Sequence, residues 1–302
     1  MNFFAPDLLE CLAAIVEEGG FEKAAARLSI TQSAVSQRLR SLETQVGTIL
    51  IVRGRPLKPT LAGRLLLKHT MQMRLLHADL EHDLGDLSPG TTGSAREEDR
   101  VSIAVNADSI ATWALPAFDT LVQRGLPLEV ITDDQDFTQE WLREGQVHGC
   151  VTTLKQALRG CKVVSLGAMI YVAVASKAAI ERFCPGGLSP HTFRKIPFIA
   201  FNRKDDLQAE FISRAFHLKH VHLNQCFVPS SEGQVRAALA SWGASVVPEL
   251  LVRPLLASGQ LINLAPSASL HVNLYWHCWN LDSAVLNALT TALVTSAAKE
   301  LK

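Results

Sequence analysis

The segment Phe21–Gly47 reads FEKAAARLSITQSAVSQRLRSLETQVG, and its pattern predicts two short helices joined by a tight turn. Apolar residues repeat at helical spacing in Phe21–Leu28, and residues 29–31 interrupt that repeat. Thr31 is suited to be the N-cap of a second helix, and Gly47 is suited to end it. The predicted buried stripe of this second helix consists of Val35, Leu39 and Leu42.

The opposite face of the second helix carries polar side chains, which we expect to face solvent. A major groove about 12 Å wide accepts one α-helix, and hydroxyls or amides near the start of that helix can reach base edges. Free N–H groups at the helix start and nearby arginines bind phosphates. The candidate DNA contacts are Thr31, Gln32, Ser33, Ser36, Gln37, Arg38, Arg40, Arg53 and Arg55.

Charge is distributed unevenly along the chain. Lys+Arg and Asp+Glu both number 29, so the formal net charge is zero. Residues 23–68 nevertheless hold nine Lys or Arg and one acid, Glu43, a net charge of +8 that favours a polyanion. Residues 129–144 hold six acids and one base, a net charge of −5 that favours a cation. The alternative for the basic segment is an ordinary helical hairpin with a solvated face.

Residues 60–87 predict one long helix. Its apolar residues include a repeat of seven, which is typical of a helix that pairs with a second copy, so a dimer is favoured. The residues of this seam are Leu66, Met73, Leu80 and Leu87, with Leu76 and Leu84 beside them. The next segment, SPGTTGS at residues 88–94, has the composition of a linker.

From residue 101 on, short apolar strands alternate with helices, which predicts an α/β sheet with parallel strands in two lobes around a ligand cleft. The expected strands are 101–105, 128–132, 149–152, 171–175, 198–201, 220–228, 244–247 and 274–279. The later expected helices are 233–240, 248–256 and 284–301.

Length and composition exclude several classes of protein. With 302 residues, 48% of them apolar and 19% charged, the chain is long enough for two domains and is neither disordered nor fibrous. Charges interrupt every apolar run within about 18 residues, so no transmembrane helix is expected. The N-terminus lacks the basic region of a signal peptide, and the six cysteines form no C-x-x-C pair. We therefore expect a cytoplasmic protein with free thiols.

Three chemical alternatives are disfavoured. The pattern H-x-x-H-x-H at residues 217–222 has no Cys or carboxylate close by in sequence for a metal site. A redox switch at Cys150 and Cys161 is opposed by the apolar strand around Cys150, where buried thiols are common. The chain has no G-x-S-x-G, G-x-G-x-x-G or P-loop motif, so we expect neither an enzyme nor a metal or cofactor.

Residues 21–52, with the basic turn after them and Thr60-x-x-Gly63, resemble the winged helix-turn-helix of LysR-type transcriptional regulators. The resemblance extends over the whole chain, and the second half is most similar to the lysine- and arginine-responsive ArgP/LysG subgroup. The segments that carry this are VNADSIATWALPA at 105–117, QALRGC at 156–161, SSE at 230–232 and LYWH at 274–277. One departure is Leu50-Ile51-Val52 in the wing, where the family often has Leu-Phe.

The resemblance implies an α+β winged helix-turn-helix, a long linker helix and a two-lobed, periplasmic-binding-protein-like α/β effector domain. The expected boundaries are 1–59 for the DNA-binding domain, 60–88 for the dimerisation helix, 89–100 for the hinge linker and 101–302 for the effector domain. Lobe I is expected at about 101–163 and 271–302, and lobe II at about 164–270. The implied partners are double-stranded promoter DNA and further copies of the chain, as a dimer or a dimer of dimers. RNA polymerase is a further candidate partner, and no membrane partner is expected.

Polar residues follow the strands of the first lobe, and we expect the co-effector there. N–H groups at a helix start bind a carboxylate, and acids at the same sheet edge can pair with an ammonium or guanidinium group. The candidate residues are Asn106, Asp108, Ser109, Asp133, Asp134 and Thr152, with Ser230, Ser231 and Glu232 from the second lobe. Lysine or arginine would suit such a site, whereas the alternative is that these residues are only N-caps.

Other functions stay open at this point. The co-effector could be a different metabolite, such as an organic acid or a nucleoside, although the acids of residues 129–144 disfavour an anion. An architectural DNA-binding protein would bind DNA without any ligand. A solute-binding or catalytic α/β protein with a helical arm would bind no DNA. The sequence does not distinguish lysine from arginine, activation from repression, or a dimer from a tetramer.

Overall fold

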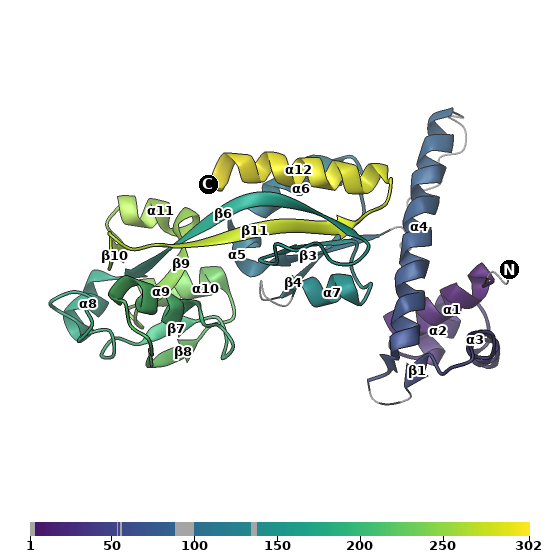
Figure 1. The fold of residues 1–302 in the computed structure, drawn as a ribbon, viewed down its shortest axis with the longest axis horizontal. Helices are drawn as coiled ribbons and strands as arrows, with labels where there is room; N and C mark the ends of the chain where they lie inside the picture. The colour runs from purple at the N-terminus through teal and green to yellow at the C-terminus, as the bar shows by residue number, and fades with distance from the viewer. Residues whose placement is uncertain (1–3, 53, 55, 88–99, 134–137) are drawn as a thin grey trace.

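The computed structural model describes residues 4–52, 54, 56–87, 100–133 and 138–302 of the chain. Figure 1 shows a helical module at the N-terminus, a long helix that stands beside it, and a larger α/β part on the other side of that helix. The elements of the first part are α1 (Pro6–Glu17), α2 (Phe21–Arg27), α3 (Gln32–Val46), β1 (Ile51–Val52), β2 (Lys58–Pro59) and α4 (Leu61–Leu87). Within the described residues, no helix is long and apolar enough to cross a bilayer.

Helices α2 and α3 form the predicted helix-turn-helix. The Oγ1 atom of Thr31 accepts a hydrogen bond from the amide of Ala34 at 3.2 Å, so Thr31 is the N-cap of α3. Gly47 ends α3 with a φ of 79°, a left-handed conformation that costs least in a residue without a Cβ. The stripe on the inner side of α3 is buried as predicted and consists of Val35, Leu39 and Leu42.

A short antiparallel hairpin of β1 and β2 forms the wing. Glu43 accepts a hydrogen bond from the amide of Leu50 at 2.9 Å, so the acid of the basic segment attaches the wing to α3. The hydroxyl of Thr60 donates to the carbonyl of Ile49 at 2.8 Å, and Gly63 lies directly against the carbonyl of Leu50. The motif Thr60-x-x-Gly63 therefore has a packing function at the junction of the wing and α4.

The apolar residues of the long helix α4 lie in three different surroundings. Leu66, Leu67 and Met73 pack on the core of the helical module, whereas Met71 and Leu75 pack on the core of the α/β part. A stripe of exposed leucines remains, which we call the leucine stripe: Leu61, Leu65, Leu76, Leu80 and Leu84.

The predicted heptad seam was therefore wrong in its first half. Leu66 and Met73 contact the helical module, because a spacing of seven residues does not distinguish two neighbouring faces of one helix. Leu80 is exposed, as a residue available for pairing would be. The side chain of Leu87 lies outside the description.

The α/β part has two lobes that share one sheet. Lobe I contains β3 (Val101–Asn106), α5 (Ala107–Ser109), a π-helical turn (Ile110–Ala114), α6 (Leu115–Gln123), β4 (Leu128–Asp133), α7 (Thr138–Arg143), β5 (Gly149–Thr152) and α12 (Ala284–Glu300). Lobe II contains α8 (Lys177–Phe183), β7 (Phe198–Ala200), α9 (Leu207–Phe216), β8 (Gln225–Phe227), α10 (Ser231–Leu239), β9 (Ser245–Pro248), α11 (Glu249–Ala257) and β10 (Ile262–Asn263). The long strands β6 (Cys161–Ala175) and β11 (Leu270–Trp279) run through both lobes, and the expected lobe boundaries fall inside or beside them (Figure 1).

The order of strands in the shared sheet is β10-β6-β11-β5-β3-β4, and β9 also pairs with β6. Strand β3 is parallel to β4 and β5, as predicted, but β11 is antiparallel to both β5 and β6, so the sheet is mixed. The expected strand 220–228 is reduced to β8, because His217 ends α9 in a left-handed conformation and residues 218–224 form no regular element.

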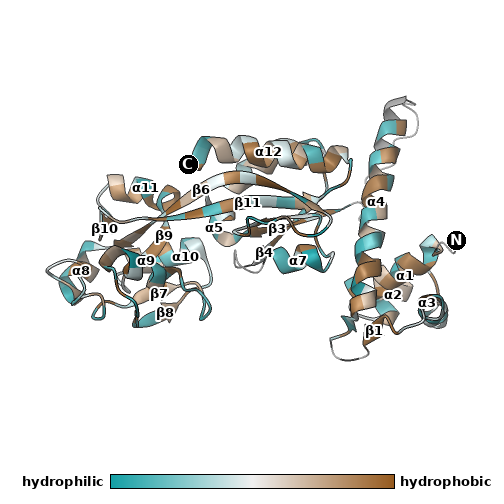
Figure 2. Ribbon diagram, in the orientation of Figure 1, coloured by the Kyte–Doolittle hydropathy of each residue, from teal (hydrophilic) through white to brown (hydrophobic). Residues whose placement is uncertain are grey.

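The main core lies where α6 and α12 cover the shared sheet (Figure 1). Trp113, Trp276 and Trp279 fill it, each with at most 1% of its surface exposed. Helix α12 contributes a regular stripe of Leu286, Leu289, Leu293 and Ala297. Figure 2 shows the matching pattern, with apolar residues along the sheet and alternating polar and apolar patches on α12.

We expect Gly63→Ala to destabilise the helical module. The new Cβ would collide with the backbone carbonyl of Leu50, and an overpacked contact of this kind costs about 1–3 kcal/mol. Calorimetry of the full chain should therefore show the unfolding transition of the helical module at a lower temperature. Gly186→Ala is the control, because no atom lies within 4 Å of the Cβ it would add. An unchanged transition for Gly63→Ala would remove the proposed packing function of this motif.

Candidate nucleic-acid interface and ligand site

The outer face of α3 presents polar side chains at its start and a cation about two turns later. The exposed or half-buried side chains of this face are Thr31, Gln32, Ser33, Ser36, Gln37 and Arg40. The hydroxyl oxygens of Thr31 and Ser33 lie 2.9 Å apart, so donors and acceptors are concentrated at the N-terminal end of the helix. Such a surface can offer hydrogen bonds to base edges and a positive charge to a phosphate.

The two arginines of α3 differ in their surroundings. The Nε atom of Arg38 lies 3.6 Å from the Oδ2 atom of Asp7, so this guanidinium is paired with α1. Arg40 is exposed on the outer face. The wing arginines, Arg53 and Arg55, lie outside the described residues.

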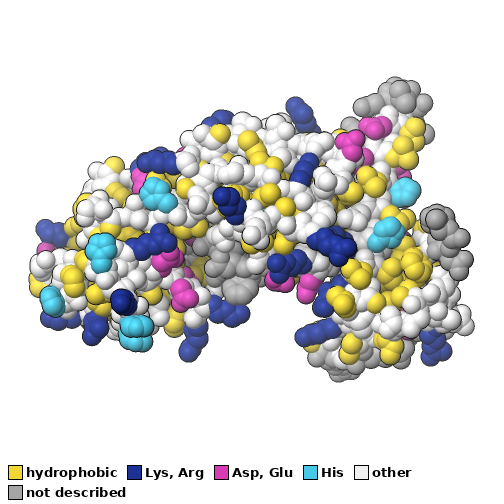
Figure 3. Space-filling model, in the orientation of Figure 1, with side chains coloured by type: hydrophobic (Ala, Val, Ile, Leu, Met, Phe, Trp, Pro, Cys, Tyr) yellow, Lys and Arg dark blue, Asp and Glu magenta, His cyan; other side chains and the backbone are white. Residues whose placement is uncertain are grey.

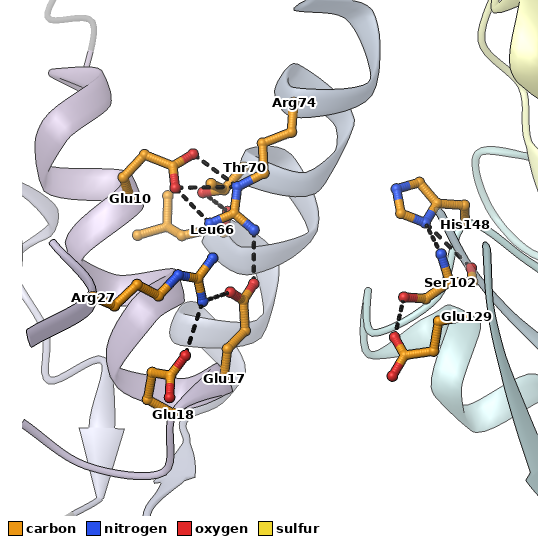
Figure 4. Close-up of polar contacts among 10 residues, drawn as sticks. All are labelled: Glu10, Glu17, Glu18, Arg27, Leu66, Thr70, Arg74, Ser102, Glu129 and His148. Atoms are coloured by element: carbon orange, nitrogen blue, oxygen red, sulfur yellow. Dashed lines mark hydrogen bonds and ion pairs between the residues drawn. The ribbon is translucent and has the colours of Figure 1, made fainter. Parts of the chain in front are cut away.

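Behind the helical module, an ion cluster fixes α4 to α1 and α2. Figure 4 shows this cluster between α1 and α4, whereas Figure 3 shows the charged side chains on the surface, some of them where the helical module faces the α/β part. The guanidinium of Arg74 donates to Glu10 and, at 2.8 Å, to Glu17. Arg27 also donates to Glu17 and contacts Glu18. The Arg74 side chain is 16% exposed, whereas those of Glu10 and Glu17 are 34% and 36% exposed, so the guanidinium is covered and the carboxylates remain in contact with water.

The cluster changes the ionisation of its members. Burial acts to raise the pKa of the Glu17 carboxyl, but the guanidiniums of Arg74 and Arg27 outweigh it and hold that pKa below its usual value. Burial likewise opposes the charge on Arg74, and its bonds to Glu10 and Glu17 outweigh that cost and raise its pKa. Glu17 and Arg74 therefore stay charged at neutral pH, and their ion pair holds α1 against α4.

The carboxyl ends of β3, β4 and β5 meet at one edge of the sheet, as predicted. Asn106 ends β3 opposite Asp133, and Thr152 ends β5. Asn106 is 2% exposed and makes no side-chain cap bond, and its Oδ1 atom has no hydrogen-bond partner among the described residues. Capping therefore does not explain Asn106. Asp134 and the side chain of Asp133 lie outside the description.

Asp108 connects the two lobes. Its Oδ1 atom accepts a hydrogen bond from the hydroxyl of Ser231 at 2.6 Å, and its Oδ2 atom accepts one from the hydroxyl of Tyr171 at 2.7 Å. Ser231 opens α10 in lobe II, whereas Asp108 lies in α5 of lobe I. The structure thus brings together two of the sequence-predicted ligand residues from opposite lobes and places a carboxylate between two hydroxyls.

The other predicted ligand residues have more ordinary surroundings. Ser230 is the N-cap of α10 and accepts a hydrogen bond from the amide of Gly233 at 3.1 Å. Ser109 is buried and accepts one from the indole of Trp113, also at 3.1 Å. Glu232 is exposed. Capping and packing therefore account for Ser230 and Ser109 in this conformation.

Sequence patterns did not identify Tyr171 or Arg74 as functional residues. Tyr171 reaches Asp108 across 63 positions, and Arg74 reaches Glu10 across 64. No local spacing links such residues, and Tyr171 was visible only as part of an apolar strand.

A buried histidine lies on the side of lobe I that faces α4 (Figure 4). The amide of Ser102 donates to the Nδ1 atom of His148 at 3.1 Å, and the His148 ring packs on Trp279 with 4.9 Å between ring centroids. Burial lowers the pKa of His148 to about 4, and the charge of Arg74 acts in the same direction. The imidazole is therefore neutral at physiological pH and serves as an acceptor.

Family models match both parts of the chain. A model of the bacterial regulatory helix-turn-helix protein of the lysR family matches residues 6–64, and a model of the LysR substrate binding domain matches residues 94–298. The transcriptional regulator ArgP of Aeromonas salmonicida is 40% identical over 98% of this chain and 97% of its own length. The regulator LysG of Mycobacterium tuberculosis is 39% identical over 96% of this chain and 92% of its own length.

Solved structures agree with these similarities. The crystal structure of ArgP from Mycobacterium tuberculosis superposes with a TM-score of 0.87 and 38% identity, and it covers 100% of this chain and 99% of its own. Full-length LysG from Corynebacterium glutamicum, solved with arginine as bound effector, has a TM-score of 0.75 and 33% identity. It covers 99% of this chain and 100% of its own. The similarity thus includes the helical module, α4 and both lobes.

We expect the buried His148 to make the fold sensitive to mild acid. Its folded pKa of about 4 lies below the ordinary value of 6.5, so between these values the unfolded chain binds the extra proton. The neutral, buried imidazole therefore makes its full contribution to the free energy of unfolding above pH 6.5, and this contribution is lost as the pH drops toward 4. At pH 5 the free energy of unfolding should be lower by about 2 kcal/mol. Urea unfolding at pH 7 and pH 5 should show a smaller acid-induced loss in His148→Gln. His77→Gln, at an exposed site on α4, is the control. Equal acid losses in wild type and His148→Gln would contradict this assignment.

Proposed function

Since the chain belongs to the LysR-type family of bacterial transcriptional regulators, we propose that α3 contacts promoter DNA and that arginine or lysine modulates this binding from the effector domain. The observation that carries the DNA-binding half is the exposed polar face of α3, beside a wing and within a segment of net charge +8. A regulator of this kind acts where promoter DNA is, so we assign it to the cytoplasm.

The DNA contacts follow from the face that α3 presents. Thr31 and Gln32 lie at the helix start, where free N–H groups meet a phosphate, and Ser33, Ser36 and Gln37 can approach base edges. Arg40 supplies a positive charge one turn later. We keep Arg53 and Arg55 as wing contacts with the DNA backbone on sequence grounds, and assign Arg38 a smaller share because Asp7 neutralises it.

The ligand half rests on Asp108 and on the relative whose solved structure contains arginine as effector. The Asp108 carboxylate accepts from Ser231 of lobe II and from Tyr171 of the shared strand β6, and it can exchange one of these hydroxyls for an ammonium or guanidinium group. The Oδ1 atom of Asn106, which has no hydrogen-bond partner among the described residues, offers one more acceptor at the same sheet edge. Asp133, Asp134, Thr152, Ser109, Ser230 and Glu232 remain candidate contacts around these two residues.

Such a ligand would regulate by shifting a population. It changes the equilibrium between two lobe arrangements only by its difference in affinity for them. Replacing the Ser231–Asp108 bond with ligand contacts supplies such a difference, because that bond exists in one arrangement and is exchanged in the other.

The leucine stripe favours pairing with a second copy of the chain. Its five leucines are between 43% and 70% exposed and follow one side of α4, which is the geometry of a paired helix. We propose that the protein is a dimer through this stripe and that two dimers assemble on DNA. RNA polymerase, which binds the same promoters, is the candidate partner of the assembled regulator.

Substitutions of the two arginines of α3 should show that Arg40 contributes more to DNA binding than Arg38. Arg40→Ala should weaken binding to a DNA fragment that the full-length protein selects from a random pool. Each lost phosphate contact should also reduce the slope of log affinity against log salt by about 0.9. Arg38→Ala is the matched control and should change the slope less. Fluorescence anisotropy between 50 and 300 mM salt measures both, and equal slopes for Arg40→Ala and wild type would remove Arg40 from the DNA contacts.

Thermal unfolding of the full chain with single amino acids tests the ligand. At 100 times its dissociation constant a ligand stabilises by about 2.7 kcal/mol, which raises the midpoint by a few degrees. We expect a rise with arginine or lysine, a much smaller rise in Asp108→Asn, and a normal rise in Asp119→Asn, an exposed acid of α6. A rise only with neutral or acidic amino acids would replace the proposed ligand with another metabolite. No rise with any amino acid would leave the DNA-binding half unaffected.

A further inference from the structure

Helix α4 packs on its own effector domain along one straight stripe, which we call the docking stripe. Its residues recur at i, i+4, i+7, i+11 and i+15, so they occupy a single face of the helix. They are Arg64, Lys68, Met71, Leu75 and Asp79, and they lie apart from the leucine stripe. The middle of the docking stripe is apolar, because Leu75 is 3% exposed and Met71 packs beside it on the core of the effector domain.

The lower end of the docking stripe meets the turn after α7. The Nη1 atom of Arg64 lies 3.7 Å from the Oε1 atom of Glu144. Gly145 has a φ of +71°, and a Cβ on it would collide with Lys68 at 2.5 Å from that residue's Cβ and 2.7 Å from its Cα. The helix and the turn therefore touch at backbone distance, which only a glycine in this conformation permits.

The upper end of the docking stripe reaches the start of α12. The amide of Val285 donates to the Oδ1 atom of Asp79 at 3.4 Å. Amides in the first turn of a helix have no acceptor within it, and a carboxylate there also interacts favourably with the helix dipole. The Oδ2 atom of Asp79 is buried and has no hydrogen-bond partner among the described residues, so the contact with α12 covers this oxygen from water although the residue as a whole is half-buried.

Helix α4 is also fixed to the DNA-binding module, through ion pairs with α1. Arg74 lies between Asp79 and Lys68 in sequence and is held by Glu10 and Glu17 of α1 (Figure 4). Movement of α4 relative to the effector domain must therefore carry the DNA-binding module with it. Helix α7 ends at the turn that contacts α4, and it follows β4, whose last residue is Asp133 at the edge of the candidate ligand site.

We infer that Asp79 and Gly145 are positioning residues that seat α4 on the effector domain, and that this seat transmits ligand binding to the DNA-binding module. The second half of this inference rests on the proposed function. In this proposal the ligand changes the contact between the lobes at Asp108, and a change in lobe arrangement shifts the turn after α7 and the start of α12, which are the two places where the docking stripe contacts the effector domain.

The first test is hydrogen exchange of the full chain, resolved to the amide of Val285. Asp79→Ala removes the acceptor, and we expect that amide to exchange at least about five-fold faster. Asp83→Ala, at an exposed acid one turn further along α4, is the matched control and should exchange like wild type. Asp79→Asn keeps an acceptor and should lie between the two. If the Val285 amide exchanges in Asp79→Ala at the same rate as in wild type, the docking of α4 on α12 is overturned.

The second test measures coupling in Asp79→Ala and, independently, in Gly145→Ala. Arginine should still raise the thermal midpoint of both variants, whereas the fold-change that arginine causes in DNA affinity should fall to less than half of the wild-type value. A purely structural role would lower the midpoint and leave that fold-change intact, and this result would overturn the transmission. Failure of arginine to stabilise wild type would instead count against the proposed ligand, and the exchange of Val285 would still decide the docking.

Discussion

The ion cluster around Arg74 is the interaction on which the arrangement of the other parts depends. One guanidinium, 16% exposed, satisfies carboxylates from two positions on α1 while it is itself part of α4. The side chains of Arg74, Glu10 and Glu17 are between 16% and 36% exposed, so water screens each ion pair in part. The apolar contacts of Leu66, Leu67 and Met73 with the helical module act together with these ion pairs. The cluster therefore makes α1, α2 and α4 one rigid piece, and the direction in which α3 presents its polar face follows from the direction of α4.

In the effector domain, two shared strands determine how the lobes can move relative to each other. Its lobes share β6 and β11, so they cannot separate as independent bodies, and relative motion must twist these strands. The register of the pair shifts between Leu274 and Tyr275, and Gly167 lies opposite Leu274 with a φ of +113°. Irregular pairing next to a glycine bends more easily than a regular ladder. The hydrogen bonds of Asp108 act across the lobes that this segment connects.

Local features of the chain were predictable from sequence, and contacts between distant segments were not. The cap at Thr31, the end at Gly47 and the buried stripe of α3 depend on neighbours within one helix, so spacing alone identified them. The parallel order of β3, β4 and β5 followed from the alternation of strands and helices. Asp108 and Ser231 were both candidate ligand residues, but their direct hydrogen bond joins positions 123 apart. The difference between Arg38 and Arg40 depends on Asp7, which belongs to another helix.

The place of β11 in the sheet has a consequence for how the protein is made. This strand lies between β5 and β6, yet it comes from residues 270–279, after all of lobe II has been synthesised. Lobe I starts at residue 101 and cannot complete its sheet until more than 170 further residues have left the ribosome. Long-range pairing of this kind folds slowly and exposes apolar strand edges in the meantime. The edge of β5 that β11 later covers stays without that partner throughout this interval, so the half-made effector domain is open to wrong pairing and aggregation.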